Sequence, residues 1–128
     1  GLNPLFIRRF ELNLAVNLGY GPVLNQCVSC GQSQTLVGFS LAEGGMVCRE
    51  CRHTTKAGII NISGECLAIL RQLEGANNNV LRRLRASAPA LDQLEHFLEQ
   101  YLQYHLERKF NLKDTIRYLK PPRQCVDN

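Results

Sequence analysis

Two Cys-x-x-Cys pairs constrain this chain of 128 residues more than any other feature. The first pair is Cys27 and Cys30, followed by Gly31, and the second pair is Cys48 and Cys51. Within each pair both thiolates can face one ion, and two such pairs supply the four soft ligands of a closed tetrahedral site. The spacing therefore predicts structural Zn²⁺. Because no coordination position stays open for water, it does not predict Lewis-acid chemistry.

Two other uses of paired cysteines compete with zinc. A disulfide framework is typical of small secreted chains, but the sequence shows no signal-peptide pattern. A thioredoxin-like redox site usually carries one pair between a strand and a helix, whereas here two pairs lie in loop and hairpin surroundings. Zinc is favoured over both. His53 could also bind a metal, although the fourth thiolate makes it unnecessary. Cys66 and Cys125 pair with nothing by spacing, which fits free thiols in a reducing cytoplasm.

Composition fits one modest globular core with a metal-bound insertion. The chain is 45% hydrophobic and 20% charged, and no apolar run approaches the length of a membrane span. The formal net charge is +4 at pH 7. The excess of positive charge is concentrated in residues 106–123, where six basic residues accompany two acidic ones.

Hydrophobic periodicity predicts helices along most of the chain. Asn3 and Pro4 form a helix start, and the residues up to Gly19 are apolar around most of the circumference, which predicts a buried first helix. Further helices are predicted over the following residues: 65–73, with Ser63 as its cap, 80–85, 90–108 and 113–119.

The first helix and the 90–108 helix are predicted to form the core together. Their facing residues are expected to be Leu5, Phe6, Phe10, Leu14 and Leu18 on the first helix, and Leu94, Leu98, Tyr101 and Leu102 on the second. His105 falls on the same stripe, and we interpret it as a core or helix-terminus histidine with a satisfied hydrogen bond.

A short β-hairpin is predicted around the second cysteine pair. Residues 35–40 alternate, residues 42–45 form a turn, and the chain then runs into Cys48, while residues 52–62 are predicted to be irregular. The predicted fold class is mainly α, a helical bundle with an inserted four-cysteine zinc finger carried on a short β-hairpin. One domain is expected, divided as follows: 3–22 first helix, 23–58 zinc finger, 63–120 helical bundle, 121–128 tail.

Several short sequence motifs, in this order along the chain, are specific enough to indicate a protein family. Phe10 begins Phe-Glu-Leu-Asn-Leu, Leu18 begins Leu-Gly-Tyr-Gly-Pro, Cys27 begins Cys-Val-Ser-Cys-Gly, and Gly44 begins Gly-Gly-Met-Val-Cys-Arg-Glu-Cys. Tyr-His-Leu at residues 104–106 lies in the last long helix. Together they resemble the C-terminal region of the bacterial DNA-repair family RecO, over roughly residues 4–119.

That resemblance implies a cytoplasmic recombination mediator without catalytic residues. Members of the family act with RecR and single-stranded-DNA-binding protein to load the recombinase RecA and to anneal complementary strands. They also carry an N-terminal OB-fold, which shares the nucleic-acid contacts. Nothing in this sequence alternates as a five-stranded barrel would, so the chain is expected to be an excised piece of such a protein.

Two functions remain open from the sequence. The first is a DNA-repair module that binds single- or double-stranded DNA through basic residues, for which the candidates are Arg82, Arg83, Arg85, Arg108, Lys109, Lys113, Arg49 and Arg52. The second is a protein-docking scaffold without DNA affinity, in which these residues are only solvated faces. An enzyme is not predicted, because no nucleophile–base arrangement or Gly-rich phosphate loop can be identified.

Any DNA binding is expected to be weak, non-specific and salt-sensitive, because few aromatic residues are available to stack on bases. The candidates are Tyr101, Tyr104, Phe110 and Tyr118, and Tyr101 is expected to be buried.

Overall fold

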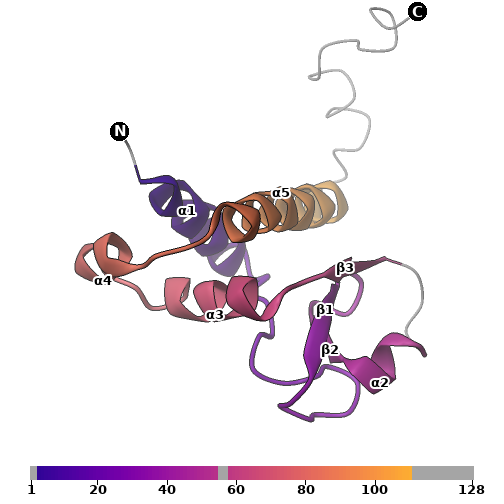
Figure 1. Cartoon of the computed structure of the whole chain (residues 1–128). Coiled ribbons are helices and arrows are strands. Elements are labelled where there is room, and N and C mark those ends of the chain that lie inside the picture. Colours follow the sequence, from indigo (N-terminus) through magenta and orange to yellow (C-terminus); the bar gives the residue numbers. More distant parts are fainter. Residues whose placement is uncertain (1–2, 55–57, 111–128) are drawn as a thin grey trace, which may run out of the picture.

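The computed structural model describes residues 3–54 and 58–110, and its fold is mainly α. In chain order the elements are α1 (Pro4–Asn17), β1 (Leu36–Ser40), β2 (Gly45–Cys48), α2 (Arg49–Arg52), β3 (Ile59–Asn61), α3 (Gly64–Leu73), α4 (Asn78–Arg83) and α5 (Ala88–Phe110). Figure 1 shows α1, α3 and α5 grouped together, with α4 at one end and the sheet with α2 at the other. The predicted helix 113–119 and the tail 121–128 lie outside the described residues.

Capping side chains set where the helices begin. The Asn3 side chain accepts a hydrogen bond from the Leu5 amide, and the Ser63 side chain accepts one from the Cys66 amide, which confirms both predicted caps. Asn77 caps α4, so this helix begins two residues before the predicted start. The Ser87 hydroxyl accepts from the Ala90 amide at 3.2 Å. Pro89 therefore lies in the first turn of α5, where its missing N–H is not needed.

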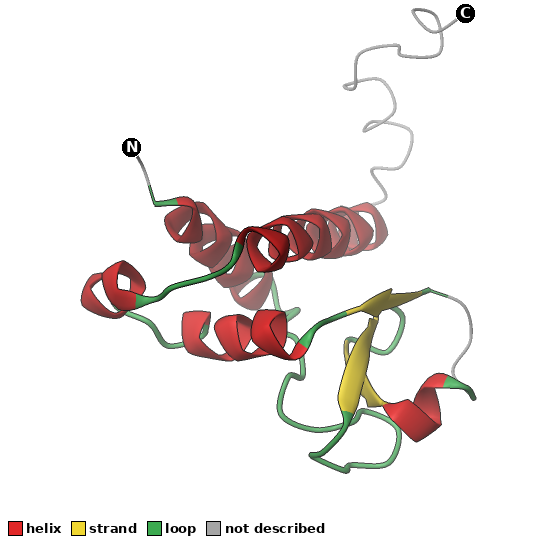
Figure 2. Cartoon of the chain, in the orientation of Figure 1, coloured by secondary structure: helices red, strands yellow, loops and turns green. Residues whose placement is uncertain are grey.

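The sheet has three strands rather than the predicted two, in the order β2-β1-β3 (Figure 2). β1 pairs antiparallel with both neighbours, so that Phe39 lies opposite Met46 on one side and Ile60 on the other. β3 falls within residues 52–62, which were predicted to be irregular. Three residues are too few to show an alternating pattern, and the pairing with β1 supplies the order.

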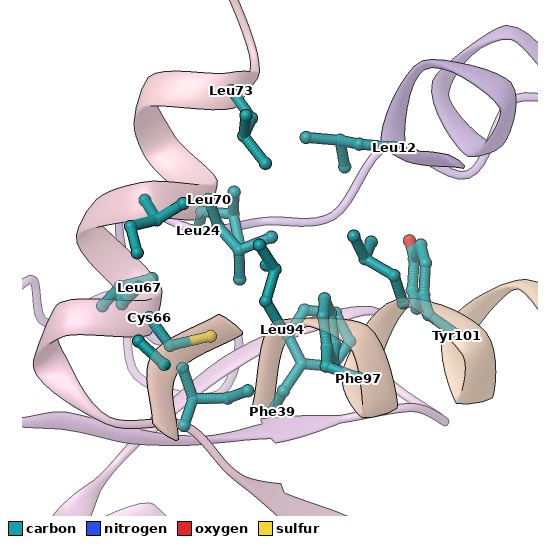
Figure 3. Close-up of a cluster of buried hydrophobic side chains, with 14 of the residues drawn as sticks. Leu12, Leu24, Phe39, Cys66, Leu67, Leu70, Leu73, Leu94, Phe97 and Tyr101 are labelled. Atoms are coloured by element: carbon teal, nitrogen blue, oxygen red, sulfur yellow. The ribbon is translucent and has the colours of Figure 1, made fainter. Parts of the chain in front are cut away.

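One hydrophobic core joins the helices to the sheet (Figure 3). Leu12 of α1, Leu70 of α3, Leu98 of α5 and Phe39 of β1 are all fully buried. The Phe39 ring meets the Phe97 ring edge-on, with centroids 4.7 Å apart, and it also contacts Tyr101. Phe39 therefore attaches the sheet to α5.

The prediction that α1 is buried around most of its circumference is wrong. Its fully buried residues lie on the single face that contacts α3 and α5, and they are Leu5, Leu12 and Ala15. Phe10, expected in the core, is 66% exposed, and Ile7 is 48% exposed. At 100° per residue these two side chains project from the opposite face of the helix. The sequence is apolar on both faces and does not reveal which one is covered.

An aromatic cluster holds the turn after α1 against α5. The Tyr101 hydroxyl donates a hydrogen bond to the Tyr20 carbonyl. The His105 ring stacks on the Tyr20 ring, with centroids 4.4 Å apart, and meets the Tyr101 and Tyr104 rings edge-on. Its Nε2 atom is buried without a hydrogen-bond partner among the described residues. The expected satisfied hydrogen bond is therefore absent at this nitrogen, and ring contacts surround the imidazole instead.

The stability of the protein should depend on pH through His105. Burial, with Arg108 nearby, lowers the pKa of His105 below its ordinary value of 6.5. The folded state then binds fewer protons than the unfolded state between those two pKa values. We expect the free energy of unfolding to be insensitive to this group above pH 6.5 and to fall as the pH drops toward the folded pKa, as measured by urea titration.

His105→Phe should flatten this part of the pH profile, because phenylalanine keeps the ring contacts and does not titrate. His96 is the matched control. It is exposed, and the Asp92 carbonyl and carboxylate raise its pKa, so His96→Gln should preserve the decline that His105 causes. An unchanged decline in His105→Phe would contradict the assignment.

Candidate metal centre

The four paired cysteines meet at one point in the structure. Their Sγ atoms all lie within 4.8 Å of one another, and the Sγ atoms of Cys30 and Cys48 are 3.8 Å apart. A tetrahedral site with Zn–S bonds of about 2.3 Å places its sulfurs about 3.8 Å apart. A disulfide needs about 2.0 Å, and all four cysteines are free thiols. The cluster therefore has the dimensions of a metal site.

The first cysteine pair lies on a tight turn. The Gly31 amide donates to the Cys27 carbonyl at 2.8 Å, and the Ser29 amide points at the Cys27 sulfur at 3.4 Å. Gly31 has φ +83°, a backbone conformation that residues with a side chain rarely adopt. Gly31 thus allows the chain to reverse directly after Cys30.

The second pair spans the junction of β2 and α2. Cys48 ends the strand and caps the helix, and its sulfur accepts a hydrogen bond from the Cys51 amide at 3.4 Å. One helical turn then returns Cys51 to the same side as Cys48. The short helix α2 was absent from the predicted elements, but its first turn is what brings these two thiols together.

Backbone pairing brings the first cysteine pair to the second. The Val23 amide donates to the Gly44 carbonyl at 3.0 Å, and the Met46 amide donates to the Val23 carbonyl at 2.9 Å. The Val28 amide then donates to the Met46 carbonyl at 2.9 Å. Residues 23–28 therefore run beside β2. A Cβ on Gly45 would lie 2.7 Å from the Val23 Cβ, so glycine is needed for this close approach.

The thiols ionise unequally because they share one small space. Burial alone would raise the pKa of Cys27, but hydrogen bonds from the backbone of Cys48, Cys30 and Ser29 outweigh it and lower the pKa to about 6. Hydrogen bonding to Cys48 is the main cause that raises the pKa of Cys51 to about 12. One anionic sulfur thus makes the next ionisation harder. A divalent cation among the sulfurs would remove this repulsion.

The basic residues predicted to contact DNA do not form one surface. Arg82 and Arg83 lie on α4, and Arg85 follows it, at one end of the described structure. Arg49 and Arg52 lie on α2, at the opposite end (Figure 1). Arg108 lies near the end of α5, with its guanidinium 5.3 Å from the Tyr104 ring centroid. Neither the Lys109 side chain nor Lys113 is described by the structure.

Other arginines serve packing. Arg8 forms an ion pair with Glu11 at 3.2 Å, and Arg71 donates two hydrogen bonds to the Leu24 carbonyl. Arg9 donates to the Ala76 carbonyl at 3.2 Å and to the Asn78 side chain at 2.8 Å, which holds α4 beside α1. Sequence reasoning missed this neighbourhood, because the two contacts of Arg9 join residues nearly seventy positions apart and no spacing rule marks them.

No helix in the described parts of the chain is long and apolar enough to cross a membrane.

Comparison with known proteins supplies the family. A family model described as "Recombination protein O C terminal" matches residues 2–114. The DNA repair protein RecO of Syntrophomonas wolfei is 48% identical over 120 residues, which cover 94% of this chain and 48% of that protein. The DNA repair protein RecO of Caldanaerobacter subterraneus is 32% identical over 110 residues, covering 86% of this chain and 44% of that protein.

The chain spans about half the length of these curated relatives. No solved structure gives a significant match. The family model covers well over half of the residues, and the resemblance inferred from the cysteine pairs and their neighbouring strings is confirmed. The chain belongs to the RecO C-terminal family.

Proposed function

We propose that this chain is a zinc-stabilised, DNA-binding module of a recombinational DNA-repair mediator. The observation that carries the proposal is the match to the RecO C-terminal family over residues 2–114. The relatives are named DNA repair proteins. Zn²⁺ is the proposed ion, because four thiolates at tetrahedral spacing suit it and leave no open coordination position. The role of the ion would be to hold the sheet and both cysteine pairs together.

Further properties are proposed for this chain because members of the family have them. They are a cytoplasmic location, action without catalysis, partnership with RecR and single-stranded-DNA-binding protein, loading of RecA and annealing of complementary strands. The domain division given above, from the first helix at 3–22 to the tail at 121–128, also remains a prediction.

Helix α4 is the best-placed DNA contact among the described basic residues. Arg82, Arg83 and Arg85 are all exposed, and α4 contains no acidic residue, whereas Glu50 lies between Arg49 and Arg52 on α2 and Glu107 precedes Arg108 near the end of α5. Phosphate groups are bound by arginine without any sequence code, and such binding weakens steeply with salt. We therefore assign the principal phosphate contacts to α4 rather than to α2 or the end of α5.

Reversal of Arg82 and Arg83 to Glu should weaken DNA binding by about tenfold or more at low salt, because two phosphate contacts become repulsive. Fluorescence anisotropy with a labelled oligo(dT) and a labelled duplex, at low and moderate salt, measures this. The matched control is Arg49→Glu with Arg52→Glu, the same charge change at the opposite end of the molecule. Circular dichroism establishes that both variants fold.

Equal losses from the two double variants would contradict the placement on α4. If the unmodified chain bound neither DNA with a salt-dependent affinity, DNA binding by this chain would be refuted. A protein-docking scaffold would then be the remaining function.

A further inference from the structure

We infer that Cys30 is an oxidation site, at which hydrogen peroxide attacks the cysteine cluster and from which a reversible disulfide to Cys48 then forms. The inference goes beyond the proposed function. It rests on the proposed zinc site and not on DNA binding. The metal centre is thereby sensitive to peroxide.

Solvent reaches the four sulfurs unequally. Cys27 and Cys48 are each 1% exposed, Cys51 is half-buried and Cys30 is exposed. Val47 is buried together with Cys27 and Cys48. Further apolar side chains pack against this group: Val28, Leu36 and Ile59. A dissolved oxidant therefore meets Cys30 first. Hydrogen peroxide is little larger than water, so Cys30 needs only contact with solvent, not an open docking surface.

A second thiol lies next to Cys30. The Sγ atoms of Cys30 and Cys48 are 3.8 Å apart, and the two sulfurs contact one another. A disulfide needs about 2.0 Å, so a modest approach of the two sulfurs is enough to form the bond. Oxidation-sensitive cysteines are typically accessible and lie beside a second cysteine that resolves the first product. Cys30 and Cys48 have this arrangement.

The chemistry takes two steps. Bound Zn²⁺ keeps the sulfurs as thiolates, the form that reacts with peroxides. The Cys30 sulfur attacks one peroxide oxygen, an S–O bond forms, the O–O bond breaks and hydroxide leaves, so that sulfur is oxidised to a sulfenic acid and peroxide is reduced. The Cys48 thiolate then attacks the Cys30 sulfur, an S–S bond forms, the S–O bond breaks and a second hydroxide leaves. Solvent protonates both hydroxides.

The disulfide replaces one link between the cysteine pairs with another. It removes two of the four thiolates and leaves Cys27 and Cys51, which are too few for a closed four-thiolate site. The new bond joins the turn that carries Cys30 to the junction of β2 and α2, where Cys48 lies. The two pairs thus stay connected after the ion leaves, and a thiol reductant reverses the change.

Disulfide mapping tests the order of events. The zinc-loaded chain, with Cys125→Ser to remove a thiol outside the described residues, is treated with equimolar hydrogen peroxide. Remaining thiols are blocked with N-ethylmaleimide, and the peptides are identified by mass spectrometry. We expect a Cys30–Cys48 peptide to appear together with released zinc, measured with a zinc-binding dye. Dithiothreitol and added zinc should restore the starting state. Cys66, which is buried in the main core, is the internal control and should stay reduced.

A first-formed disulfide that lacks Cys30 would overturn the inference. A first-formed disulfide from Cys30 to Cys27 or to Cys51 would overturn the assignment of Cys48. Release of zinc without any disulfide would overturn both.

Ligand exchange tests Cys30 as the entry point. Cys30→His should retain zinc, because three cysteines and one histidine form a common structural site, but an imidazole cannot form a disulfide. Peroxide should release zinc from this variant at least about fivefold more slowly. Cys51→His is the matched control, since it has the same ligand set but keeps Cys30 and Cys48, and its release rate should stay within about twofold of the starting chain.

Equal resistance in the two histidine variants, or an unchanged rate in Cys30→His, would contradict the inference. Should Cys30→His fail to retain zinc, the disulfide map decides alone. A chain that carries no zinc before oxidation would refute the proposed metal site. A zinc-loaded chain that forms no disulfide at Cys30 would refute this inference and leave the proposed function standing.

Discussion

Cys48→Ser is expected to unfold residues 23–58 while α5 stays helical. A structural zinc site in a small peptide contributes roughly 10 to 16 kcal/mol of apparent binding free energy, and that energy is available only to the folded form. The sheet is small, with strands of five, four and three residues, so strand pairing alone provides little stability to the turns that carry the cysteines. By contrast, α5 packs on α1 and α3 through its own apolar stripe. The loss of folded structure should therefore be large in the zinc-binding region and small in the helices.

Metal analysis, circular dichroism and amide NMR spectra would measure this result. The unmodified chain should carry about one zinc, as expected for one closed four-thiolate site, and Cys48→Ser should lose the metal and the strand signals together. Cys66→Ala is the matched control. Cys66 is buried in the main core rather than in the cluster, and burial raises the pKa of its thiol to about 11. A Cys48→Ser variant that kept its metal and melted like the unmodified chain would contradict the assignment.

Leu98→Ala should destabilise the protein by about 3 to 5 kcal/mol, because it removes a fully buried side chain and leaves a cavity among α1, α3 and α5. The whole free energy of unfolding of a small domain is only about 5 to 15 kcal/mol, so a loss of this size approaches complete unfolding. Phe10→Ala was expected from the sequence to cost as much. The structure places that ring in solvent, and its truncation should cost less than about 1 kcal/mol.

Urea unfolding of the two variants under the same conditions compares these costs. The pair tests the orientation of α1 directly, since one variant alters the covered side and the other the exposed side. A large loss in Phe10→Ala with a small one in Leu98→Ala would reverse the assignment of the two faces.

Features encoded within a few residues were predictable from the sequence. The two cysteine pairs meet as their spacing indicates, and Asn3 and Ser63 cap the helices they were expected to cap. The apolar stripe of α5 likewise predicted its buried residues Leu94 and Leu98. In each case the physical cause is local: a side chain reaches an amide two or three residues away, or a repeat matches the helical turn.

Features that depend on distant partners were not predictable. β3 is ordered by its pairing with β1, and α1 shows two apolar faces, of which one packs against α3 and α5 in the part of the chain that the structure describes. Charge runs were equally ambiguous. Arg71 and Arg82 are both exposed basic helix residues, yet Arg71 donates two hydrogen bonds to the distant Leu24 carbonyl, whereas Arg82 donates to Asn79 within its own helix. Only the three-dimensional arrangement distinguishes a packing arginine from one available to a ligand.

The segment that carries the first cysteine pair also protects the sheet from self-association. Residues 23–28 hydrogen-bond to the side of β2 that faces away from β1, and so occupy amide and carbonyl groups that would otherwise be open. An uncovered strand with apolar residues such as Met46 and Val47 is a template for pairing with another chain. Loss of the metal, which should unfold this region, would leave the apolar segment around Met46 and Val47 free to pair with another chain. The ion would then be needed to prevent aggregation as well as to maintain the shape of the protein.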